Sequence, residues 1–144
     1  MQKVTMLGID LAKTSFHIHG CDASGKKIVS KALKRHQLEL FVTNLEPCTI
    51  AMEACGSAHW WAGRFVSLGH SVKLIAPQFV KPFVKGNKND RADAEAIAEV
   101  ASRPTMRFVA IKNSQHLDVQ AIHRVRLRLV SQRTALTNEM RGLL

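Results

Sequence analysis

Short apolar runs separated by turn signals predict that the chain begins with three strands. The run at 3–10, KVTMLGID, is apolar up to its closing aspartate, which is typical of a strand buried on both faces. At 15–22, SFHIHGCD alternates apolar residues with histidines, and after the turn signal ASGKK an extended pattern resumes at 27–34, KIVSKALK. These segments together predict an antiparallel meander.

The middle of the chain predicts two helices and two strands. Apolar residues recur at helical spacing at 36–45, and a proline follows. The run at 48–56, CTIAMEACG, is apolar apart from one glutamate, and 57–69 has helical periodicity with Ser57 as its expected cap and a glycine at its end. At 70–77, HSVKLIAP predicts a buried strand. A strand, a helix and a strand in this order are typical of a parallel crossover unit.

The last part of the chain predicts two further helices and a short strand. The stretch at 78–89 is basic and contains proline and glycine, which indicates a short helix followed by a loop. The segment 90–103 predicts a helix with small residues on its apolar face, ended by a proline, and 105–111 predicts an added edge strand. From Ser114 onward apolar residues recur every three or four positions without proline, so we expect one long helix.

Composition and charge point to a single domain that binds a polyanion. The chain has 144 residues, of which 46% are hydrophobic, and this is enough to build one core. Its formal net charge of +10 favours nucleic acid as the partner and an anionic membrane surface as the second choice, because lysines and arginines release counterions from phosphates. No apolar stretch reaches the length of a membrane span and no signal peptide is recognisable, so we expect a cytoplasmic protein without a membrane partner.

The three cysteines predict reduced thiols rather than disulfides. Cys21, Cys48 and Cys55 are odd in number and form no C-x-x-C pair, which fits a reducing compartment and buried thiols. A zinc site made of Cys48, Cys55 and His59 is the alternative, but no fourth ligand stands at a usual spacing.

Four carboxylates are the candidate catalytic residues. Asp10 and Glu53 follow apolar runs, so they fall at the carboxyl ends of two strands that we expect to be neighbours. Asp90 and Asp93 are three residues apart and share one face of the first turn of a helix. If all four converge, they form an oxygen-only site for Mg²⁺, or for Mn²⁺ as its substitute. Two such ions about 4 Å apart promote phosphodiester transfer.

Each of these acids also has a structural interpretation. Asp90 alone is typical of a helix N-cap, and Asp93 is typical of a first-turn acid that interacts favourably with the helix dipole. A solvated position for Glu53 requires that its strand lies at the edge of the sheet, because the surrounding TIAMEAC is apolar.

Basic residues near these acids are candidates for holding phosphates. Lys85, Lys88 and Arg91 lie around the aspartate pair in sequence, and Lys13 follows Asp10 closely, where it is a candidate to neutralise either a phosphate or a carboxylate. A solvated basic loop is the alternative for the first group.

The long helix is a candidate for both self-association and nucleic-acid binding. Its apolar stripe needs a partner helix, and we expect a homo-oligomer through a coiled-coil-like contact; packing back on its own domain is the alternative. The same helix carries three arginines that are available to nucleic acid, Arg124, Arg126 and Arg128. Elsewhere, Trp60 and Trp61 are adjacent, so at least one is expected in the core, and base stacking is an alternative role.

Four segments in order resemble a known family. GIDLAKTSFHIHG, AMEACGSAHWWA, KNDRADAEAIAE and HRVRLRLVSQRTALTNEMRGLL resemble the N-terminal region of transposases of the insertion-sequence 110 family, the DEDD recombinases. The resemblance covers essentially the whole chain. It implies an α/β, ribonuclease-H-like (RuvC-like) mixed sheet flanked by helices at 1–112, followed by the start of a long coiled-coil-like linking helix at 113–144.

The resemblance also implies an activity and its partners. The four acids at 10, 53, 90 and 93 match the DEDD motif, which implies divalent-metal-dependent cleavage and transfer of DNA strands. Family members carry a second domain with a catalytic serine and use a structured guide RNA to pair donor and target DNA. No stretch here resembles the serine domain, so we expect a fragment that is not competent alone.

Two other functions compete with this interpretation. GIDLAKTS also resembles the first phosphate loop of actin-like and sugar-kinase-like ATPases, but Ala12 and Lys13 stand where that loop offers glycine and threonine. A non-catalytic nucleic-acid-binding module, with the acids as structural caps, is the second alternative.

Overall fold

The computed structural model describes residues 3–84 and 90–144, with only the backbone of Asp90. The chain forms two compact units, Met1–Ile111 and Lys112–Leu144, which are described separately. The elements in chain order are β1 (Met6–Leu11), β2 (Ser15–Cys21), β3 (Lys27–Lys34), α1 (Arg35–Thr43), β4 (Thr49–Glu53), α2 (Ala58–Ser67), β5 (Ser71–Ile75), α3 (Pro77–Val80), the 3₁₀ turn η1 (Lys81–Phe83), α4 (Asp90–Ala101), β6 (Phe108–Val109) and α5 (Ser114–Leu143).

Six strands of the described residues form one mixed sheet in the order β3-β2-β1-β4-β5-β6. The pairs β1/β2, β2/β3 and β5/β6 are antiparallel, which confirms the predicted meander and the added edge strand. The pairs β1/β4 and β4/β5 are parallel, which confirms the crossover unit built around α2. The strands β1 and β4 lie at the centre of the sheet, and a solvated edge position for Glu53 is therefore wrong.

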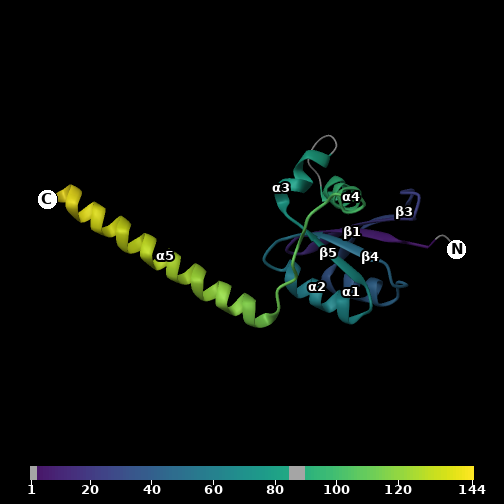
Figure 1. The fold of residues 1–144 in the computed structure, drawn as a ribbon, viewed down its shortest axis with the longest axis horizontal. Coiled ribbons are helices and arrows are strands. Elements are labelled where there is room, and N and C mark those ends of the chain that lie inside the picture. The colour runs from purple at the N-terminus through teal and green to yellow at the C-terminus, as the bar shows by residue number, and fades with distance from the viewer. Residues whose placement is uncertain (1–2, 85–89) are drawn as a thin grey trace. The chain divides into compact units, whose positions relative to one another are not determined.

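Alternating residues of the strands separate two cores, one on each face of the sheet. Ile9, Phe16 and Met52 belong to the larger core, which α1 and α2 cover. Ala51 and Ile75 face the other way and belong to the smaller core, which α4 covers. Figure 1 shows the sheet between these two layers. Because side chains of a strand alternate between faces, each residue of β1 and β4 is assigned to one layer.

The face under α4 is crowded because two backbones meet there. A Cβ atom added to Gly8 of β1 would collide with the carbonyl oxygen of Ala94 and would lie 2.8 Å from the amide nitrogen of Ala98. The small residues of α4 permit this close approach, and the alanines at 94 and 98 extend the small-residue face that the sequence predicts. The helix is thereby held against the central strand.

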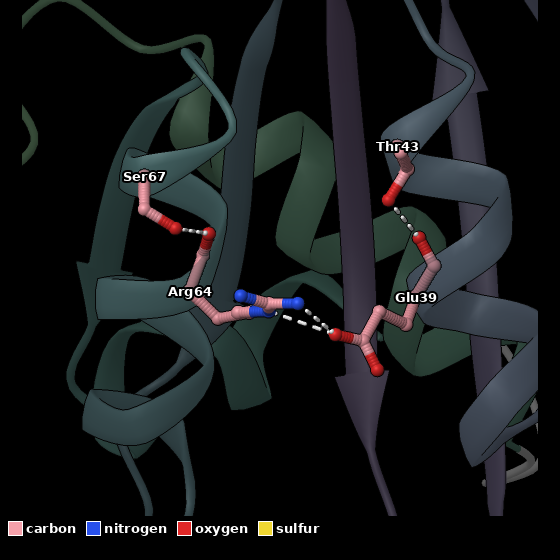
Figure 2. Close-up of polar contacts among 4 residues, drawn as sticks. All are labelled: Glu39, Thr43, Arg64 and Ser67. Carbon is pink, nitrogen blue, oxygen red and sulfur yellow. Dashed lines mark hydrogen bonds and ion pairs between the residues drawn. The ribbon is translucent and has the colours of Figure 1, made fainter.

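The helices on the opposite face are joined by a charged pair. Both Nε and Nη2 of Arg64 in α2 lie 2.7 Å from Oε1 of Glu39 in α1 (Figure 2). In the same view, Thr43 donates a hydrogen bond to the carbonyl oxygen of Glu39, and Ser67 donates one to that of Arg64. Because the pair is solvent-exposed, it contributes about 0.2–1 kcal/mol to the free energy of unfolding, and the shared core does most to fix the two helices.

Two details around α2 differ from or refine the expectations. Ser57 occupies the N-cap position, but with φ −91° and ψ −14° its backbone is already helical, and its side chain makes no capping hydrogen bond within the described chain. The predicted Ser57 cap is therefore wrong, because a capping side chain needs the extended backbone of a normal N-cap. Of the two tryptophans, Trp61 is buried and Trp60 is half-exposed, as the sequence predicts.

The second unit is the predicted long helix. It begins after Asn113, whose side chain accepts a hydrogen bond from the backbone nitrogen of His116 at 2.9 Å. All residues of α5 are described, and none of them is buried. Among the described residues, no helix has both the length and the apolar character that crossing a membrane requires.

Candidate active site

Asp10 and Glu53 lie next to each other on the sheet. The parallel pairing of β1 and β4 matches Gly8 with Ala51 and Ile9 with Met52, so the next step of this register sets Asp10 beside Glu53. Both acids are partly buried. They alternate with Ile9 and Met52 of the larger core, and their side chains therefore lie on the face that α4 covers. The expected adjacency at the carboxyl ends of two neighbouring strands is confirmed.

The helix that carries Asp90 and Asp93 covers the same face of the sheet. Asp93 is partly buried and directly precedes Ala94, whose carbonyl oxygen meets the backbone of β1 at Gly8, two residues before Asp10. Asp90 is the first residue of α4, so the N-cap position falls on residue 89, outside the described residues. The side chain of Asp90 is also outside them.

One neighbour of these acids was missed by sequence reasoning. His17 of β2 is the direct partner of Asp10 in the antiparallel pairing, and paired residues project from the same face. His17 is partly buried. The alternation of SFHIHG contained the signal, because it assigns the histidines to the face opposite Phe16, but the strand register was needed to match His17 with Asp10.

The donor set fits a hard divalent cation in its chemistry. Carboxylate oxygens are the ligands that Mg²⁺ and Mn²⁺ prefer, and Asp10, Glu53 and Asp93 offer only such oxygens. Among the side chains that the structure describes, no group of three His, Cys, Asp or Glu residues is arranged as a ready metal site. The full set includes Asp90, whose side chain lies outside that search. The residues thus fit the ion by type, and Asp10 and Glu53 are neighbours on the sheet, but the described acids including Asp93 are not gathered into one ready site.

The predicted phosphate-binding residues are distributed over both units. Lys13 is exposed in the turn between β1 and β2, beside the carboxyl end of β1. Arg91 is exposed in α4, and its Nε donates a hydrogen bond to Oγ of Ser30 at 3.2 Å. Lys85 and Lys88 lie outside the described residues. The arginines of α5 that the sequence singles out are all exposed: Arg124, Arg126 and Arg128.

The cysteines do not form the alternative zinc site in the described part of the chain. Cys21 and Cys48 are buried free thiols, whereas Cys55 is exposed, so the prediction of burial is wrong for Cys55, which lies in the turn before α2. Burial raises the pKa of the Cys48 thiol to about 11, which disfavours the thiolate that zinc requires. The backbone nitrogen of Cys48 donates instead to Nδ1 of His70 at 3.3 Å, a structural contact.

A cavity lies at the amino end of β1, at the opposite end of this strand from Asp10. It has a volume of about 610 Å³ and is lined by residues including Thr5, Cys21, Asp22, Glu95 and Glu99. Thr5 and Met6 precede or begin β1, so this cavity lies at the amino end of that strand, away from Asp10.

Comparison with known proteins assigns the chain to a family. A family model described as a transposase, of DEDD type and named for insertion sequence 110, matches residues 7–144. The chain belongs to the insertion-sequence 110 family of DEDD transposases. The family match supports the resemblance of the four quoted segments and disfavours the ATPase alternative.

Individual relatives of this transposase family agree with the assignment. The chain is 56% identical over 141 residues to a probable family 20 transposase of Pseudomonas aeruginosa, covering 98% of this chain and 42% of the relative. It is 49% identical over 144 residues to the transposase for insertion sequence element IS1328 of Yersinia enterocolitica, covering 100% of this chain and 43% of the relative. The chain therefore spans about two fifths of the length of these curated relatives.

Solved structures show the fold of this transposase chain. Thermus thermophilus RuvC, solved alone, aligns with a TM-score of 0.54 at 16% identity, covering 72% of this chain and 99% of RuvC. The same enzyme in complex with a Holliday junction substrate aligns with a TM-score of 0.54 at 15% identity. The mixed sheet flanked by helices is thus the expected RuvC-like, ribonuclease-H-like fold.

Proposed function

We propose that the first unit is the catalytic domain of a DNA transposase that cleaves and transfers DNA strands with bound Mg²⁺. The observation that carries this proposal is the adjacency of Asp10 and Glu53 on one face at the carboxyl ends of the two central strands. The transposase relatives and the RuvC-like fold support the choice of DNA as substrate. Complete recombination is proposed for the full-length protein, acting on DNA in the bacterial cytoplasm.

In this mechanism the protein supplies the set of carboxylates. Asp10, on the central strand β1, would hold the divalent ions together with Glu53, Asp90 and Asp93. The close contact of α4 with Gly8 holds the helix that carries Asp93 over the face of Asp10 and Glu53. A bound metal would supply activation of an attacking water or hydroxyl and stabilisation of the leaving oxygen of the phosphodiester. Lys13, Lys85, Lys88 and Arg91 hold neighbouring phosphates by charge.

A crystal of the protein soaked in Mn²⁺ tests this site directly. We expect an anomalous difference peak within about 2.0–2.4 Å of a carboxylate oxygen of Asp10 and of at least one of Glu53, Asp90 or Asp93. A second soak that includes a short DNA supplies the phosphates that often complete a Mg²⁺ shell. Absence of a peak in both soaks would contradict the catalytic proposal.

We also propose that α5 joins two copies of the chain and contributes a surface to nucleic acid, including the structured guide RNA. The helix exposes an apolar stripe that it cannot bury alone, and the exposed residues of this stripe are Val119, Ile122, Val125, Leu129, Leu136 and Met140. A coiled-coil-like contact with the same stripe of a second copy would bury it. The arginines at 124, 126 and 128 provide positive charge for the RNA or DNA backbone.

Removal of α5 is expected to abolish self-association. A chain cut after Ile111 should sediment as a monomer, because the apolar stripe is gone while the core of the first unit is complete. The matched control replaces Arg124 and Arg128 with alanine in the full chain, which removes charge outside the apolar stripe, and it should sediment like the parent. A truncated chain as oligomeric as the parent would refute the dimer contact.

A further inference from the structure

Positive side chains gather at the same edge of the sheet as the candidate acids. The pairing of Leu11 with Phe16 and of Ser15 with Lys34 brings the end of β3 level with the carboxyl end of β1. Lys13, Lys34 and Arg35 are all exposed at this edge. A strand of nucleic acid that approaches Asp10 therefore meets positive charge on the α1 side as well as on the α4 side.

An exposed tryptophan lies at this edge as well. The helix α2 begins at Ala58, five residues after Glu53, so the two Cα atoms are at most about 18 Å apart. Trp60 is in the first turn of α2, and 52% of its surface is exposed. A large aromatic side chain that remains half in water at a basic edge is available to a ligand.

The neighbouring residue Trp61, and not Trp60, fills the hydrophobic core at this position. Trp61 is 1% exposed and packs against Phe65 with ring centroids 5.3 Å apart and against Phe16 at 5.5 Å. Trp60 meets Trp61 edge to face, with a centroid distance of 4.9 Å. This contact fixes the orientation of the outer ring, while the core beneath is filled without it.

Arg35 of α1 packs against the exposed Trp60 and extends this surface. Its guanidinium carbon lies 5.1 Å from the ring centroid of Trp60 and 5.1 Å from that of Trp61. The residue is the first of α1, whose start is fixed by a hydrogen bond from the backbone nitrogen of Lys34 to Oε1 of Gln37 at 2.8 Å. We call Arg35 and Trp60 together the Arg35–Trp60 platform.

We propose that the Arg35–Trp60 platform stacks an unpaired base of the nucleic-acid strand whose phosphates enter the carboxylate edge. Aromatic rings and guanidinium planes both stack on bases, and they do so with little sequence preference. The ligand is a single-stranded segment, because the faces of a base inside a duplex are already covered by its neighbours. This inference rests on the proposed function for its substrate class. It adds a contact that positions a strand a few nucleotides from the acids.

Binding of oligonucleotides to the full chain in EDTA tests the platform without involving the metal site. The probes are a fluorescein-labelled single-stranded 12-mer of thymidine and a 12-mer of the same backbone with every base removed. Trp60→Ala is expected to weaken binding of the thymidine 12-mer about 5- to 150-fold, the range that corresponds to loss of one stacked base. Binding of the abasic 12-mer should not change, because its phosphates still meet the basic edge. Trp60→Phe should retain most of the affinity.

The matched control is Val66→Ala, which trims another exposed apolar side chain of α2 near its other end and should leave both affinities unchanged. Thermal unfolding of each variant shows that the fold is kept. Equal affinity of Trp60→Ala and the parent for the thymidine 12-mer would overturn the platform and leave the metal site untouched. Equal weakening on both probes would also overturn it, because the tryptophan would then act through the phosphates. If Trp60→Ala weakens binding of the thymidine 12-mer alone but the Mn²⁺ soaks show no peak, the catalytic proposal is rejected and the platform is kept.

Discussion

Asp10→Asn in the full-length transposase is expected to reduce strand cleavage by at least about 10³-fold. The substitution keeps the size of the side chain but removes the charge that holds a divalent cation, and metal ions contribute several kcal/mol to stabilisation of the transition state. The same loss is expected for Glu53→Gln, because the two residues are adjacent across β1 and β4. The measurements are cleavage of a labelled DNA substrate and Mn²⁺ binding by calorimetry.

Glu46→Gln provides the matched control for these variants. Glu46 is exposed and pairs with Lys3 at 2.9 Å, so its neutralisation changes the net charge equally without touching the candidate site. We expect full cleavage activity from this variant. Unchanged cleavage of the labelled DNA by Asp10→Asn or Glu53→Gln would rule out the assignment of these acids. Loss of activity in the Glu46 variant would indicate instead a general sensitivity to charge.

The elements of the fold were predictable because their hydrophobic patterns are local. The strand at 3–10, the helix at 57–69 and the long helix from Ser114 each carry a periodicity that specifies which face is buried. The order of strand, helix and strand then predicted parallel pairing, since parallel neighbours need a crossover connection and that connection is usually a helix. The ends of the elements were less predictable. Ser57 has the right residue type for a cap but the wrong backbone conformation, which only the surrounding turn decides.

The part of the candidate site that depends on single strands was predictable from the sequence. Asp10 and Glu53 each end an apolar run, and this alone assigns them to the carboxyl edge of a parallel sheet. The neighbourhood of His17 and Asp10 was not predictable, because it depends on the register of two antiparallel strands, and a shift by one residue would turn His17 to the other face. The exposure of Cys55 likewise depends on a turn whose packing the sequence does not encode locally.

The close approach of α4 to β1 makes Gly8 a second position with a large expected effect. Gly8→Ala is expected to lower the free energy of unfolding of the first unit by about 1–3 kcal/mol, and Gly8→Val by more, because the added atoms meet backbone that cannot rotate away. For a domain of this size, each 1 kcal/mol corresponds to a shift of roughly 4–8 °C in the unfolding temperature. Differential scanning calorimetry of both variants measures the effect.

Gly63→Ala is the matched control, since it makes the same chemical change at a glycine inside α2 where an added Cβ meets nothing within 4 Å. It should raise the free energy of unfolding by about 0.5–1 kcal/mol, because alanine is the better helix former. A Gly8→Ala variant as stable as the parent would show that α4 moves off the sheet without cost. Such a helix would not hold Asp93 over the face of the sheet that carries Asp10 and Glu53. The free energy of unfolding and the Mn²⁺ affinity of the Gly8 variants should therefore fall together, since both depend on the same contact between α4 and the central strand.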